Sequence, residues 1–155
     1  MVQWLAGMRT TAERLRETAG VWQDYGGAWT ASTTNPSIGN GALAFRYMQI
    51  GSTIEFMVRI VWGSTTSDGD GTYDFGLPAA PKAYGGSSNI GGTATCIIEI
   101  GSATNRYSFG VLLYNTGLVR VADDGETSGL SAGGWDGHGW EDGNFLLMSG
   151  RYEVD

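Results

Sequence analysis

Residues 41–62 read GALAFRYMQIGSTIEFMVRIVW, two runs of alternating side chains joined by Gly51-Ser52. In the second run one apolar set recurs at every other position, namely Ile54, Phe56, Val58, Ile60 and Trp62. Successive side chains of a strand point to opposite faces, so this period of two predicts a half-buried antiparallel strand. Because Gly51 accepts a positive φ at no steric cost, the Gly-Ser pair predicts a tight hairpin turn.

The chain beyond this hairpin repeats aromatic-rich strands and glycine turns. Further strands are expected at 29–34, 72–77, 93–100, 105–114, 118–122 and 144–154. Gly150 in the last strand is interpreted as a bulge. Two long glycine-rich loops, 78–92 and 123–143, show no periodic pattern. About eight short strands at this spacing predict an antiparallel β-sandwich over residues 28–155.

Composition agrees with one all-β domain and argues against some partners. The 155 residues include 26 Gly, six Trp, seven Tyr and five Phe, but only 16% charged residues. Such a chain is long enough to bury a core without disulfides or metal. The net charge is −7 and Lys82 is the single lysine. Since a surface that follows phosphates needs clustered Lys and Arg, nucleic acid is not an expected partner.

Residues 1–27 form the one part of the chain with a helical pattern. Thr10 and Glu13 match a capping box, and Gly20 is a natural helix stop. Apolar residues spaced alternately by three and four form a seam, consisting of Leu5, Met8, Ala12, Leu15, Ala19 and Trp22. Such a seam must pack against another surface. This surface belongs to a symmetry mate, to a larger partner or to the β-body of the same chain. The segment is therefore expected to serve attachment or oligomerisation.

The residue types needed for catalysis or zinc binding are scarce. His138 is the only histidine, Cys96 lies in an apolar strand, and no serine shows a nucleophile elbow. One histidine and one cysteine are too few to bind zinc in a tetrahedral site of nitrogen and sulfur ligands. Carboxylates in the loops are interpreted as solvated turn residues, with calcium binding left as an alternative. We therefore expect no enzyme activity and no cofactor; a hydrolase using His138 is the weakest alternative.

Aromatic residues in the polar loops are the candidate ligand site. Trp135 and Trp140 flank His138 in one long loop, and Tyr84 lies in the other. Aromatic side chains on loops can stack on sugar rings or anchor a protein partner. The alternative interpretation is that they close the ends of the sandwich. No apolar run approaches 18 residues and no signal peptide is evident, so synthesis in a host cytoplasm without membrane insertion is expected.

The motifs TNP (34–36), GNG (39–41), Arg46-Tyr47, WGSTT (62–66) and LP (77–78) together resemble a module of small virion proteins. These proteins belong to bacteriophages of actinobacteria. The ending SGRYEV (149–154) and the opening from Trp4 to Leu15 are similar to the same proteins. The resemblance implies a jelly-roll-like β-module, usually homotrimeric, on a short attachment segment that includes Trp4. It provides no catalytic residues, and it implies an architectural role for the turns.

The expected function is therefore that of a virion structural protein. The expected partners are two further copies of the chain, and the major capsid protein or tail proteins of the particle. The position would be that of a capsid decoration, a head fibre or a minor tail protein, attached by the N-terminal segment. The alternative is a carbohydrate-binding module of a tail fibre that recognises a glycan of the host surface, where identical chains would bind with avidity.

Overall fold

The computed structural model describes residues 20–84, 92–100, 106–114, 116–121, 130–135 and 138–155. Within these ranges the structure contains β-strands and no helix, which confirms the prediction of an all-β fold. The expected N-terminal helix falls almost entirely in residues 1–19, outside the described part of the chain, and stays a prediction.

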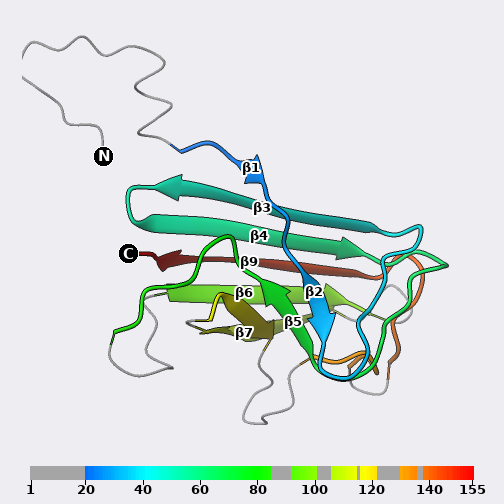
Figure 1. Ribbon diagram of the computed structural model, residues 1–155. Coiled ribbons are helices and arrows are strands. Elements are labelled where there is room, and N and C mark those ends of the chain that lie inside the picture. Colours follow the sequence, from blue (N-terminus) through cyan, green and yellow to red (C-terminus); the bar gives the residue numbers. More distant parts are fainter. Residues whose placement is uncertain (1–19, 85–91, 101–105, 115, 122–129, 136–137) are drawn as a thin grey trace, which may run out of the picture.

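In the described part of the chain, nine strands form one antiparallel sheet in the order β1-β3-β4-β9-β6-β7-β8-β5-β2. Their bounds are β1 Gln23–Asp24, β2 Trp29–Ala31, β3 Ala42–Ile50, β4 Thr53–Val61, β5 Tyr73–Gly76, β6 Gly92–Glu99, β7 Arg106–Tyr114, β8 Leu118–Val121 and β9 Phe145–Glu153. The sheet curls, so that β2 and β5 lie across the long strands β9 and β6 (Figure 1). The two layers of this curled sheet enclose the core, and the fold is consistent with the predicted sandwich.

The first hairpin forms as its alternation predicts. β3 and β4 pair along their whole length, from Ala42 opposite Val61 to Ile50 opposite Thr53. Gly51 in the turn has a φ of 60°, a value that glycine adopts without strain. The inward side chains of β4 are at most 1% exposed, and they are Ile54, Phe56, Val58 and Ile60. Burial of this row explains why the register of the hairpin is unique.

The C-terminal strand β9 lies in the middle of the long layer, between β4 and β6. Its pairing runs without interruption through Gly150, which faces Phe56 on β4 and Ala94 on β6. The expected bulge at Gly150 is therefore wrong. A Cβ atom at this position would collide with the side chain of Ala94 and lie 2.6 Å from the carbonyl oxygen of Thr93. Glycine is needed here because β6 approaches closely.

β1 is a short strand that the sequence pattern did not indicate. Gln23 pairs with Tyr47 and Asp24 with Arg46 at the free edge of β3. The sheet therefore begins inside the segment 1–27 that was assigned to attachment. This pairing sets the direction in which the chain enters the β-body, because it places residues 20–22 beside β3.

Candidate functional site

Trp140 belongs to the core and not to an exposed ligand site. Its ring stacks on that of Trp62 at the end of β4, with centroids 3.9 Å apart and planes inclined by 4°. The side chain is only 9% exposed, and its indole N–H donates to the carbonyl oxygen of Ser131 over 3.1 Å. Trp29 and Tyr73 complete this aromatic group, which closes one end of the sandwich.

Trp135 and His138 lie at the same end and pair with each other through their backbones. The backbone N–H of each donates to the carbonyl oxygen of the other over 2.9 Å. The Trp135 ring packs edge-on against Phe109, with centroids 4.7 Å apart, and both Trp135 and His138 are half-buried. These contacts match the alternative interpretation, in which the loop aromatics close the sandwich. A ligand-binding role for the pair stays a prediction.

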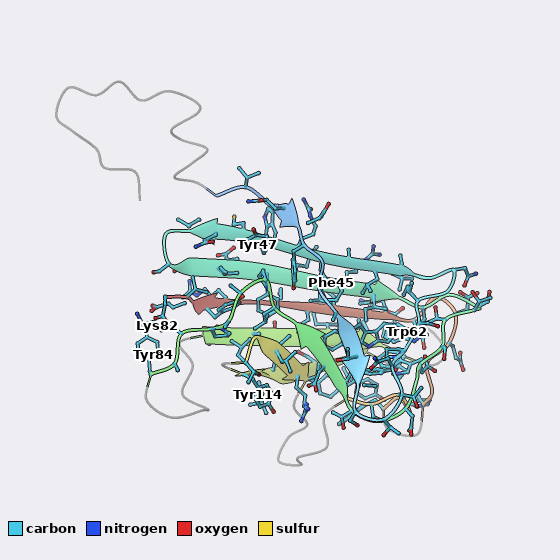
Figure 2. All side chains as sticks on the ribbon, in the orientation of Figure 1. Phe45, Tyr47, Trp62, Lys82, Tyr84 and Tyr114 are labelled. Atoms are coloured by element: carbon cyan, nitrogen blue, oxygen red, sulfur yellow. The ribbon has the colours of Figure 1, made fainter. Side chains whose placement is uncertain are left out.

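Tyr84 lies at the opposite end of the molecule from Trp62 (Figure 2). Its hydroxyl donates to the carboxylate of Glu153, and the Lys82 ammonium lies 5.9 Å from the centre of its ring. The hydrogen bond to Glu153 raises the pKa of the exposed Tyr84 phenol. The structure therefore separates Tyr84 from the other three residues of the predicted ligand site.

Of the predicted attachment residues, the structure describes only Trp22. The others lie outside the described residues, and they are Trp4, Leu5, Met8, Ala12, Leu15 and Ala19. The Trp22 side chain is 39% exposed, and the Arg46 guanidinium lies 6.0 Å from the centre of its ring. Arg46 in turn forms an ion pair with Asp24 over 3.1 Å. The last residue of the seam is thus held against β3 by Arg46.

The face of β3, β4, β9 and β6 that points away from the core is here called the outer face. The register places two of its cross-strand rows side by side: Ala44–Arg59–Leu147–Ile97 and Val61–Phe145–Glu99. Its apolar side chains, all partly or fully exposed, form the apolar patch, defined as Ala44, Met57, Val61, Ile97, Phe145 and Leu147. Arg59 lies within the patch and makes no hydrogen bond or ion pair in the described part of the chain.

The opposite half of the outer face is hollowed and mixes polar and apolar groups. A depression of about 330 Å³ lies over β4, β9 and β6, and we call it the Trp22 hollow. Its polar lining is provided by Glu55, Thr93, Thr95, Ser149 and Arg151, and the larger, apolar share of the lining includes Trp22, Phe56 and Ala94. A second depression of about 410 Å³ adjoins it and shares Thr93 and Arg151. Sequence patterns could not indicate this hollow, because its residues come together only through strand pairing.

The turns that carry the sequence motifs are bound to each other. Asn40 accepts hydrogen bonds from the backbone N–H and the hydroxyl of Thr65, and the Thr65 hydroxyl accepts from the backbone N–H of Asn40, each over 2.9 Å. The Thr66 hydroxyl donates to the carbonyl oxygen of Ile38 over 2.6 Å. A Cβ atom at Gly39, where φ is 56°, would collide with the Thr65 backbone. The GNG and WGSTT motifs therefore form one hydrogen-bonded structure. The contacts between the two turns explain why these residue types occur there.

Two titratable side chains with shifted pKa values, Asp68 and Cys96, have structural roles. Asp68 accepts the indole N–H of Trp62 over 2.7 Å, and partial burial raises its pKa. Burial raises the pKa of the Cys96 thiol to about 12, so this thiol is not a reactive nucleophile at neutral pH. In the described part of the chain no three His, Cys, Asp or Glu side chains are grouped to hold a metal ion. No described helix is long and apolar enough to span a membrane.

Comparison with protein-family models, curated proteins and solved structures finds no match for this chain. Two surfaces of the molecule are candidates for function, the apolar patch and the Trp22 hollow. They occupy the two halves of the same outer face.

Proposed function

We propose that this protein is a non-catalytic structural component of a bacteriophage particle, and that it assembles through the outer face of its long sheet layer. The apolar patch is the observation that carries the proposal. Contiguous accessible apolar surface on a sheet is a typical site of protein association, and in the patch Ile97 is exposed while the other members are partly exposed. Met, Phe and Arg, which are enriched in protein interfaces, all occur here as Met57, Phe145 and Arg59.

The N-terminal segment supports assembly at this same face. An added Cβ at Gly20 would lie 2.8 Å from Ile50 and 3.0 Å from Met48, two residues of β3 whose alternation places them on the outer face. Trp22 follows on that face as part of the hollow. The chain therefore enters the β-body on the outer face, beside the hollow, and the predicted seam precedes this point in the sequence.

Three copies around an axis would bury both features together. In this arrangement the patches of neighbouring copies face the axis, and the seams associate as a short helical bundle at one end. Each chain carries a net charge of −7, so Coulomb repulsion opposes association and burial of apolar surface must drive it. The particle context, as a capsid decoration, head fibre or minor tail protein, rests on the resemblance of the turn and strand motifs.

Recovery of tagged protein in purified phage particles tests this function. We expect the full chain to be incorporated, and a chain with Leu147→Glu to be lost from particles because a buried unpaired carboxylate is costly. The matched control is Leu118→Glu, since Leu118 is an exposed leucine of β8 outside the patch. Incorporation of Leu147→Glu at the level of the control, or failure of the full chain to join any particle, would contradict the proposal.

A further inference from the structure

Beyond the proposed structural role, we infer that the Trp22 hollow is a binding site for an uncharged saccharide. The hollow lies on the outer face, in the half that adjoins the apolar patch. Two cross-strand rows form its floor, Glu55–Arg151–Thr93 and Ser149–Thr95, and Trp22 forms a wall. Its volume of about 330 Å³ lies at the lower end of the range of about 300–1,000 Å³ that is usual for ligand pockets.

The aromatic wall is fixed before a ligand arrives. Trp22 immediately precedes β1, whose two residues pair with Tyr47 and Arg46. The Arg46 guanidinium lies over the indole ring, and its own position is set by the 3.1 Å ion pair with Asp24. A side chain that is already ordered loses less conformational entropy when it binds, which favours a small ligand.

The polar groups of the hollow are available to a ligand. The side chains of Glu55, Arg151, Thr93, Thr95 and Ser149 make no hydrogen bond or ion pair with the described part of the chain. Glu55 and Arg151 are opposite each other in the register of β4 and β9, yet they do not form an ion pair. The hollow therefore presents a free acceptor, a free multiple donor and three hydroxyls side by side.

This combination fits a sugar ring better than other classes of small ligand. A pyranose has an apolar face of C–H groups that packs on an aromatic ring, and hydroxyls at its rim that both donate and accept. Glu55 disfavours phosphate and other anions, whereas Arg151 disfavours cations. The charged and hydroxyl groups disfavour a purely apolar molecule. An uncharged polyhydroxylated ring can hydrogen-bond to these groups and pack its C–H face on the apolar part of the lining.

The adjoining depression gives room for a second ring. It shares Thr93 and Arg151 with the Trp22 hollow and is also lined by Thr53 and Glu153. Glu153 accepts the hydroxyl hydrogen bond of Tyr84. Of the four loop residues in the predicted ligand site, Tyr84 is thus the one connected to this surface. The proposed ligand is thus a saccharide, as in the prediction from the loop aromatics. The proposed site, however, lies on the outer face and not in the loops.

Titration of the full chain with a panel of monosaccharides and disaccharides, followed by NMR chemical shifts and calorimetry, tests the site. The panel contains glucose, galactose, mannose, N-acetylglucosamine and disaccharides of each. We expect at least one member to bind in the millimolar range or tighter and to shift resonances of Trp22 and Arg151. Trp22→Ala and Arg151→Ala should each weaken binding about tenfold, which corresponds to about 1.4 kcal/mol.

Two controls make this test decisive. Arg59→Ala removes an exposed arginine of the outer face outside the hollow, and binding should not change. Trp22→Phe keeps an aromatic wall and should retain most of the affinity. Absence of binding by every member of the panel would overturn the inference. Equal affinity of the wild type, Trp22→Ala and Arg151→Ala would overturn it as well, and neither result bears on assembly through the apolar patch.

Discussion

The inner and outer faces of the long sheet layer are built from the same strands but have different roles. On β4, Phe56 and Val58 point inward and are 0% exposed, whereas Met57 and Arg59, which follow them in alternation, point outward and remain accessible. β9 shows the same alternation, with Met148 buried. The inner face is predominantly apolar and determines stability. The outer face is divided into the apolar patch and the Trp22 hollow, and we assign function to it.

Alanine substitutions at adjacent residues of β4 should give the largest difference in stability between the inner and the outer face. Phe56→Ala leaves a cavity beside Tyr152, whose ring centre is 5.9 Å from that of Phe56, and should cost about 3–5 kcal/mol in the free energy of unfolding. Met57→Ala on the outer face should cost less than about 1 kcal/mol. Denaturant titration measures both values. Similar losses for the two variants would show that the faces do not differ in the way described.

Alanine substitutions of one core and one outer-face tryptophan should show the same difference in stability. Trp140→Ala removes the ring stacked on Trp62 and should destabilise the fold by about 3–5 kcal/mol. Trp22→Ala removes a partly exposed ring and should change stability by no more than about 0.5 kcal/mol. Thermal unfolding followed by circular dichroism distinguishes these outcomes. A stable Trp140→Ala variant would restore the loop tryptophans as candidates for ligand contact.

The strands could be predicted from the sequence because their signal is local. Alternation in residues 41–62 and in the later runs indicated the long strands within one or two residues of their observed bounds. The order of the strands is not local information. Insertion of β9 between β4 and β6 places Gly150 against Ala94, so the glycine that suggested a bulge instead permits close packing.

The position of the candidate site could not be predicted from the sequence, and a saccharide ligand stays a proposal. Trp140 is buried because Trp62, which is distant in the chain, stacks on it, and no pattern around Trp140 reveals this contact. Trp22 fits the apolar seam by its spacing, but its place beside Glu55 and Arg151 depends on the register of β1 on β3 and of β9 on β4. Residues that meet through pairing of distant strands carry no joint signature in the sequence.

The solution mass of the purified full chain, measured by light scattering over a range of concentrations, tests the role of the outer face most directly. We predict a mass three times the chain mass of 16.5 kDa, and a single-chain mass for Leu147→Glu with an unchanged circular dichroism spectrum. A monomeric wild type at all concentrations, or a Leu147→Glu variant that remains trimeric, would contradict assembly through the apolar patch.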